Sequence, residues 1–150
     1  MRVLWFAFTA FAVGIAPALA ATDVVFTGNV SDTCTLAVPT PGTMTLSGDG
    51  KTLGSDQSLG VPATVTVLSL GGNSVTLAAP TLTNSPIGYG GGETVQMSYS
   101  GLASHAYTTQ QQTFSLGILP LTSLIINMQV LNNSGFIQGT YKAKTVLTCS

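Results

Sequence analysis

Charged residues are scarce in this chain of 150 residues. Asp, Glu, Lys and Arg make up 6% of it, with four cations and five anions. Proteins that bind nucleic acids carry clusters of Lys and Arg that neutralise phosphates, so we expect no nucleic-acid partner. So little charge is also unusual on the surface of a soluble monomer, and it is typical of a chain whose surface is covered by neighbouring molecules.

The side chains that usually carry catalysis and metal binding are few: one histidine and two cysteines. His105 lies in an expected loop with no acidic residue near it in sequence, and a general base needs a nucleophile and an orienting group. One histidine and two cysteines do not complete a tetrahedral zinc site, and the five carboxylates are dispersed. We therefore expect no enzyme activity, no metal and no cofactor.

Long apolar runs are missing except at the N-terminus. Residues 1–20 hold one charge, an apolar run from Val3 to Ile15, and Ala18-Leu19-Ala20. This run is shorter than the ~20 apolar residues of a spanning helix, and Ala-x-Ala after a short apolar core is typical of a secretory signal. The sequence predicts a signal peptide over residues 1–20, one domain over residues 21–150, and no membrane span in the mature chain.

Helical periodicity is missing after residue 20. The chain instead shows short runs of alternating polar and apolar residues, separated by Gly, Pro and Asn. We expect strands within residues 24–38, 43–47, 63–70, 74–82, 93–99, 111–119, 121–131 and 139–150. Seven to nine short strands in a chain of about 130 residues predict an all-β fold, an antiparallel immunoglobulin-like β-sandwich.

Some runs carry more specific expectations. Residues 63–70 and 74–82 are joined by Gly71-Gly72-Asn73 and predict a hairpin. The run 121–131 is apolar on both faces, so it should be a central strand or be covered by a partner. Ile118 is in phase with the apolar residues of its run and should point inward.

The last twelve residues alternate most clearly. Their more apolar face holds Tyr141, Ala143, Thr145, Leu147 and Cys149, and the opposite face holds Lys142, Lys144, Val146 and Thr148.

The other cysteine, Cys34, also lies on the more apolar face of its run. Export permits disulfides, so a bridge between Cys34 and Cys149 would join the first strand to the last. Two free thiols, or a bridge between two molecules, are the alternatives.

The two ends of the domain resemble chaperone-usher pilus subunits. In the segment from Val25 to Leu36 an aromatic residue, a glycine and a valine lead to a cysteine, as in their first strand. In Gly139 to Val146 a glycine and then a tyrosine open the final alternation, as in their last strand. The resemblance implies an immunoglobulin-like domain that lacks its final strand. The gap would be filled first by a periplasmic chaperone and then by the N-terminal extension of the next subunit.

The resemblance also assigns roles to residues. Cys34 is the structural cysteine, and Tyr141, Ala143, Thr145 and Leu147 form the edge of the groove. The N-terminal strand has Val24, Phe26, Gly28 and Val30 in phase. Three arrangements stay open: the segment up to Val30 is itself the donated strand, the subunit accepts a strand without donating one, or the domain is complete.

We therefore expect a structural subunit of an extracellular, fimbria-like fibre, exported through the periplasm to the cell surface. Expected partners are other copies or related pilus subunits, a periplasmic chaperone, an outer-membrane usher, and a host or surface receptor. The alternative is a self-complete secreted adhesin or carbohydrate-binding module. For that alternative Tyr89, Tyr99 and Tyr107, in or beside expected loops, would supply the aromatic contacts.

Overall fold

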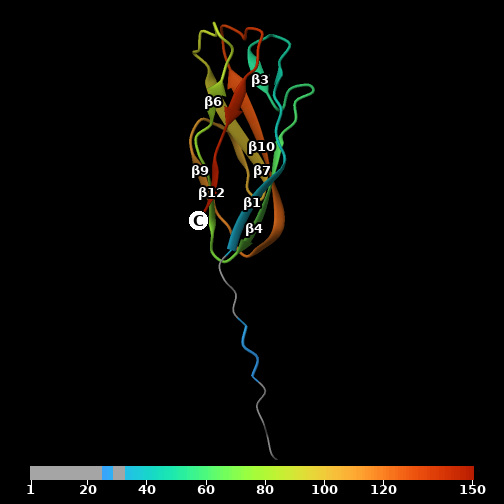
Figure 1. The fold of residues 1–150 in the computed structure, drawn as a ribbon, viewed down its shortest axis with the longest axis vertical. Helices are drawn as coiled ribbons and strands as arrows, with labels where there is room; N and C mark the ends of the chain where they lie inside the picture. Colours follow the sequence, from blue (N-terminus) through green and yellow to red (C-terminus); the bar gives the residue numbers. More distant parts are fainter. Residues whose placement is uncertain (1–24, 29–32) are drawn as a thin grey trace, which may run out of the picture.

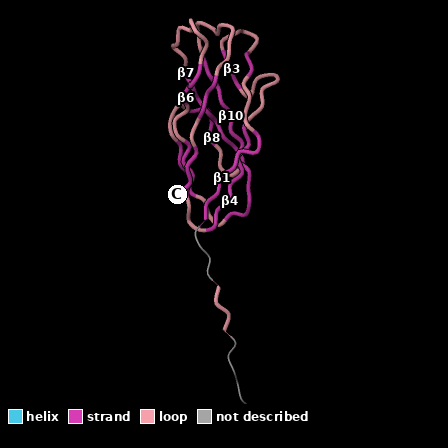
Figure 2. Tube along the Cα trace, in the orientation of Figure 1, coloured by secondary structure: helices cyan, strands magenta, loops and turns pink. Residues whose placement is uncertain are grey.

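The computed structural model describes residues 25–28 and 33–150, and its regular structure there consists of strands without a helix (Figure 2). The strands are β1 (Thr33–Thr40), β2 (Thr45–Leu46), β3 (Thr52–Gly54), β4 (Ala63–Leu70), β5 (Ser74–Leu77), β6 (Thr81–Asn84), β7 (Thr94–Gly101), β8 (His105–Thr108), β9 (Gln112–Ser115), β10 (Leu119–Leu131), β11 (Lys142–Lys144) and β12 (Leu147–Cys149). All the pairings are antiparallel, which confirms the predicted all-β, antiparallel class.

Twelve strands stand where seven to nine were expected, because two of the runs are interrupted and because β3 and β8 lie in segments where no strand was expected. Pro80 separates β5 from β6, since proline has no N–H to donate to a ladder. Thr145 and Val146 separate β11 from β12. No helix in the described part of the chain has the length and apolar character needed to cross a membrane. The predicted signal peptide, residues 1–20, lies outside the described residues.

The larger sheet is built around β10, which spans the length of the body (Figure 1). One edge of β10 pairs with β7 along Leu124–Leu131. Its other edge pairs with β4 along Leu119–Ile126 and then with β3 along Gln129–Leu131. Strand β1 continues this sheet beyond β4, and β2 continues it beyond β3. The prediction of a central strand within residues 121–131 is therefore confirmed.

The second layer consists of β12-β5-β9 and the pair β11-β6. Side chains from both layers form the core, because alternate residues of each strand point to the same face. The fully enclosed ones come from β4, β5, β7 and β10: Val65, Val67, Val75, Leu77, Met97 and Leu124. Burial of these side chains contributes about 1.5–3 kcal/mol each.

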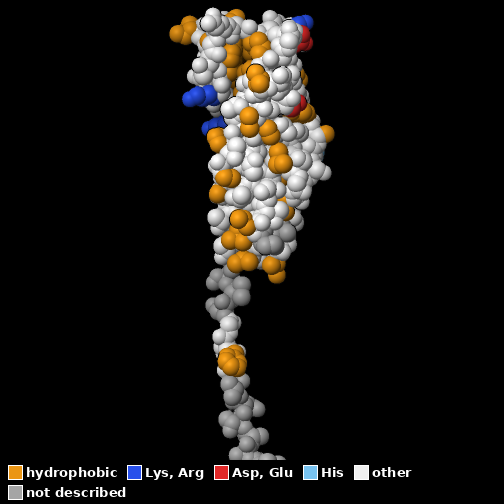
Figure 3. Space-filling view, turned by 90° about the vertical axis from the view of Figure 1, so that its right-hand side faces the viewer, with side chains coloured by type: hydrophobic (Ala, Val, Ile, Leu, Met, Phe, Trp, Pro, Cys, Tyr) orange, Lys and Arg blue, Asp and Glu red, His pale blue; other side chains and the backbone are white. Residues whose placement is uncertain are grey.

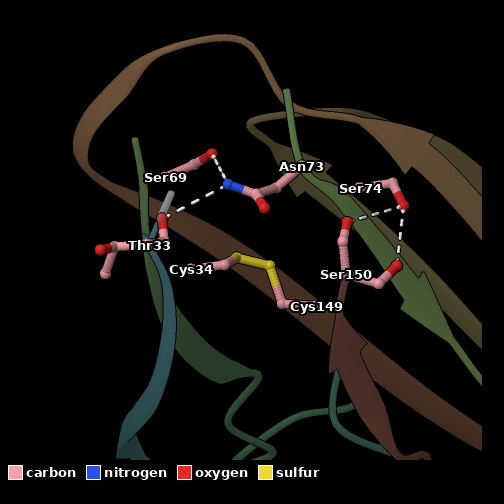
Figure 4. The surroundings of a disulfide bond; sticks show 7 residues. All are labelled: Thr33, Cys34, Ser69, Asn73, Ser74, Cys149 and Ser150. Atoms are coloured by element: carbon pink, nitrogen blue, oxygen red, sulfur yellow. Dashed lines mark hydrogen bonds between the residues drawn. A yellow bond between two sulfur atoms is a disulfide. The ribbon is translucent and has the colours of Figure 1, made fainter. Parts of the chain in front are cut away.

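The expected hairpin between residues 63–70 and 74–82 is wrong. Strand β4 already pairs with β1 on one edge and β10 on the other, so it has no free edge for β5. The turn at Gly71–Asn73 instead carries the chain from one sheet to the other, and β5 pairs with β9 and β12. Asn73 holds this crossing, since its side-chain amide donates to Thr33 O (3.3 Å) and Ser69 Oγ (3.0 Å) (Figure 4).

Two expectations about single side chains also need correction. The first strand was expected to begin near residue 24, with Phe26 inward, but β1 begins at Thr33 and Phe26 is 91% exposed. Ile118 was expected inward and is 78% exposed, because β9 ends at Ser115 and the alternation stops there. Val24 and Val30, assigned to the same N-terminal strand, lie outside the described residues.

The predicted disulfide between Cys34 and Cys149 is confirmed, with a Cα–Cα distance of 6.0 Å. It joins β1, an edge strand of the larger sheet, to β12, an edge strand of the smaller one (Figure 4). Beside it, the Ser74 and Ser150 backbones exchange hydrogen bonds of 2.6 and 3.0 Å, which hold the end of the chain to β5.

Replacing Cys34 by serine should lower the melting temperature by about 10 °C or more. The bridge closes a loop across 115 positions, and loss of such a disulfide costs about 2–5 kcal/mol. Calorimetry of Cys34→Ser and of the Cys34→Ser/Cys149→Ser double variant measures the effect, and the double variant removes any contribution from a free thiol. An unchanged melting temperature in both would contradict this role of the bridge.

Candidate functional site

An open groove runs along one side of the molecule, where the smaller sheet ends short of the larger one. It encloses about 650 Å³. One wall is formed by β11 and β12, and the other by Val38 and the segment Pro41–Met44 that follows β1. In Figure 3 hydrophobic side chains lie in a hollow toward the upper end of the body.

The wall beside the last strands has a free backbone edge. Strand β11 pairs only with β6, and β12 pairs only with β5, among the residues that the structure describes. On the other wall, β1 pairs only with β4. A free strand edge presents unpaired N–H and C=O groups, which can form a ladder with an added strand. The groove therefore has edge strands on both sides.

The side chains that were predicted to form the groove edge are brought together on this wall. Tyr141, Ala143, Thr145 and Leu147 all line the groove. Each is half-buried, and the residues between them are exposed, so the predicted alternation is present. In a completed core these side chains would be fully buried by the strands around them. Here they are only half-buried, so part of their cover is missing.

The floor of the groove is the inner face of the larger sheet. Leu53, Ala63 and Met128 are half-buried there, between the enclosed Val65 and Ile126. An extended segment placed beside β11 and β12 would widen the smaller sheet by one strand and cover these side chains. The floor is apolar, so this cover would contribute hydrophobic free energy as well as ladder hydrogen bonds.

The two ends of the groove differ. At the Leu147 end, the Cys34–Cys149 disulfide ties the two walls together; we call this end of the molecule the disulfide end. At the Tyr141 end no covalent link crosses between the described walls. The groove is thus closed at one end by a covalent bond and open at the other.

Three aromatic rings mark the open end. Tyr141 meets Tyr89 and Phe136 edge to face, at ring-centroid distances of 5.2 Å each, and Tyr89 lies parallel to Phe136 at 6.0 Å. We call these three rings the aromatic cap and this end of the molecule the cap end. Such ring pairs contribute roughly 0.5–1.5 kcal/mol each beyond area burial. The Tyr141 hydroxyl donates to Ile137 O (3.0 Å) and accepts from Ile137 N (3.2 Å).

Asn132 and Gly139 keep the loops of the cap end in place. Asn132 is 4% exposed, and its amide donates to Tyr89 Oη (2.7 Å) and Gly91 O (3.2 Å). Gly139 has φ +153° and lies so close to Pro86 that an added Cβ would be 2.4 Å from the ring. Only glycine fits both conditions, which is the physical reason for the glycine two residues before Tyr141.

Residues 25–28 lie apart from the body (Figure 1). Val25 and Phe26 are 81% and 91% exposed, and an added Cβ at Gly28 would meet no atom within 4 Å. Figure 1 shows residues 25–28 beyond the disulfide end. These large apolar side chains therefore have no cover from their own domain.

The aromatic residues proposed for sugar binding do not form one surface. Tyr99 lies on β7 at 6% exposure and stacks on Phe114 and His105. Tyr107 lies on β8 with its hydroxyl buried, whereas Tyr89 belongs to the aromatic cap. His105 was expected in a loop and instead begins β8, where it is exposed. No group of three potential metal-ligating side chains occurs among the described residues.

Sequence reasoning found the last-strand wall and missed the rest of the groove. The opposite wall and the floor come from residues far apart in the chain, and no local pattern joins them. The sequence shows only that Val38 shares the phase of Cys34 and Leu36; the structure shows that it is 58% exposed and lines the groove.

Compared with known proteins, the chain matches no family model, and the searches of curated proteins and of solved structures gave no match.

Removing the Tyr141 hydroxyl should destabilise the protein, whereas removing the Tyr107 hydroxyl should not. Tyr141→Phe loses two hydrogen bonds to Ile137, a cost of about 1–2 kcal/mol. The Tyr107 hydroxyl is buried and makes no hydrogen bond, although the Asp56 carboxylate lies close enough to affect its ionisation. Urea unfolding of the two variants tests the contrast, and equal losses would contradict it.

Tyr107 should also make the stability of the folded protein depend on pH in the alkaline range. Burial, reinforced by Asp56, raises the pKa of Tyr107 to about 12, above its ordinary value of 10.0. The unfolded chain therefore loses this proton first, and stability should fall as the pH rises from about 10 to about 12. Tyr107→Phe should show a shallower fall over this window in melting experiments. Parallel curves for the two proteins would refute the assignment.

Proposed function

We propose that this protein is a structural subunit of an extracellular fibre, and that its groove accepts an extended strand from another copy of the chain. The observation that carries the proposal is an apolar groove between two free strand edges, in a domain whose own N-terminal apolar residues are exposed. Strand addition satisfies both features at once, because the added strand completes the ladder and buries its alternate side chains.

The N-terminal segment has the length and pattern that the groove requires. Tyr141 to Leu147 is seven residues, about 20 Å of extended chain. Val24 to Val30 is also seven residues, with Val24, Phe26, Gly28 and Val30 on one face. Of the three arrangements left open by the sequence, this favours the segment up to Val30 as the donated strand. Of this segment the structure describes residues 25–28, which belong to no strand, and Val25 and Phe26 are exposed.

The disulfide favours one direction of insertion. The donated strand continues into a whole domain at its C-terminal end, so that end must leave through the open cap end. The N-terminal end then lies at the disulfide end, and the strand runs antiparallel to β11 and β12. The same bridge impedes insertion of a molecule's own segment, because Thr33 adjoins the disulfide and the segment would have to fold back past it.

This direction also matches the outer-facing side chains. With Val24 opposite Leu147 and Val30 opposite Tyr141, Val25 lies opposite Val146, which is 50% exposed. Thr27, the middle residue, lies opposite Lys144 in either direction. The parallel arrangement would place Val25 opposite Lys142 instead. Cross-strand pairs of like polarity contribute roughly 0.2–1 kcal/mol, which favours the antiparallel register.

The proposal includes three further features that follow from the resemblance to pilus subunits. These are the immunoglobulin-like identity of the sandwich, the secretion route, and the chaperone and usher partners. The two cysteines in a disulfide are compatible with an oxidising compartment. Sparse charge and free strand edges accord with a surface covered by neighbouring subunits.

Replacing Phe26 by aspartate in the mature chain should prevent assembly while leaving the groove intact. Burying a phenylalanine contributes about 1.5–3 kcal/mol, so association should weaken at least about tenfold. Light scattering and electron microscopy of the wild-type protein should show oligomers or fibres, and Phe26→Asp should remain monomeric. Val25→Asp is the matched control: it adds the same charge to the outer face of the segment, and its effect should be smaller.

A synthetic peptide of residues 21–32 should bind the monomeric Phe26→Asp protein, and the same peptide with Phe26→Asp should not. Isothermal titration calorimetry measures both. A wild-type protein that stays monomeric at high concentration, together with a Phe26→Asp protein that binds neither peptide, would overturn the proposal.

A further inference from the structure

We propose that successive copies also meet end to end, with the cap end of the subunit that accepts the strand against the disulfide end of the subunit that donates it. The inference rests on the proposed function. It identifies the partner surface as a second copy of this chain, and it adds an interface outside the groove.

The length of chain between the donated strand and the body requires this contact. Val30 would lie at the Tyr141 level of the accepting subunit, and β1 of the donating subunit begins at Thr33. Three residue steps span about 10 Å at most, so the donating body starts directly above the accepting one. Thr33 lies at the disulfide end of its own domain, paired with Leu70. That end must therefore face the cap end of the accepting copy.

Each of these two ends exposes large apolar side chains. At the cap end, Ile87 is fully exposed and Ile137 is 44% exposed. Ile87 follows Pro86, which contacts Gly139, and Ile137 is tied to Tyr141, so both lie beside the aromatic cap. At the disulfide end, Ile118 is 78% and Leu121 69% exposed.

Pairings place these side chains at opposite ends of β10. Leu119 pairs with Ser69, which on its other side pairs with Cys34 of β1. Leu116 N donates to Asn73 O (2.7 Å), so Ile118 and Leu121 lie at the disulfide end. At the other end of β10, Asn132 N donates to Lys51 O (2.9 Å) within the loops of the cap end. Hydrophobic side chains appear at both ends of the body in Figure 3.

The charge distribution permits an apolar contact. Residues 69–74 and 115–121, which make up most of the disulfide end, contain no charged side chain. Pairing Ile118 and Leu121 with Ile87 and Ile137 would remove four exposed side chains from water. The contact would also restrict the angle between neighbouring subunits, which strand addition alone would leave to the short connection.

Charged substitutions at the two ends test the contact. Ile118→Asp and Ile87→Asp should each raise the critical concentration for assembly about tenfold or more, and shorten the fibres seen by electron microscopy. The Ile118→Asp/Ile87→Lys double variant should recover part of the loss, because the new carboxylate of one copy would face the new ammonium of the next. The Ile118→Asp/Ile87→Asp double variant should assemble worst.

Leu59→Asp is the matched control. Leu59 is 89% exposed, but its loop lies beside β2, where Thr45 Oγ1 donates to Ser58 O (2.7 Å). Its φ of +69° suits aspartate better than leucine, so the change should not unfold the protein. Assembly of Leu59→Asp should equal that of the wild type.

The peptide of residues 21–32 separates this inference from the proposed function. Phe26→Asp proteins that also carry Ile118→Asp or Ile87→Asp should bind the peptide as Phe26→Asp alone does, which also shows that they are folded. Normal peptide binding with assembly equal to that of Leu59→Asp would overturn the end-to-end contact and leave strand addition standing. Loss of peptide binding in the Phe26→Asp parent would overturn both.

Discussion

The disulfide between Cys34 and Cys149 is the constraint on which the arrangement of this molecule depends. On one side of the body each sheet ends in a free edge strand, β1 in the larger sheet and β12 in the smaller one. Nothing in a pair of free edges determines how far apart they lie. The covalent bond holds them together at one end only. The space between them is therefore a groove with a closed end and an open end, and this difference gives an inserted strand its direction.

The cap end is held by interactions of another kind. Asn132 is buried, and its side-chain amide forms hydrogen bonds with Tyr89, Gly91 and Ser134. Asn132 and the aromatic cap fix the loops around the groove mouth without a covalent link, which leaves the mouth open.

The sequence predicted those parts of the fold that alternation controls. Residues 141–149 were assigned the right inward and outward faces, because strand side chains alternate whatever the partner strand is. The run 121–131 was correctly expected to be central, since β4 and β7 pair with its two edges, although Leu121 and Ile125 on it stay exposed. The cysteine pair was predictable because two cysteines in one chain have a single intramolecular pairing.

Other features depended on which edges were already taken, and local pattern does not encode that. Gly71-Gly72-Asn73 is a good hairpin turn, yet β4 had no edge left, so the turn became a crossing between sheets. Phe26 and Ile118 keep the phase of inward residues, yet both side chains are exposed.

By itself, then, the sequence determined the all-β class, the two faces of the last strand and the one intramolecular pairing that two cysteines allow. Only the tertiary structure decided that one side of the sandwich is open, that its floor is apolar, and that Val25 and Phe26 lie outside their own core. The physical reason is the separation in sequence over which each interaction acts. Alternation and covalent chemistry act on neighbouring residues or on a unique pair, whereas a groove is formed by where distant strands stop.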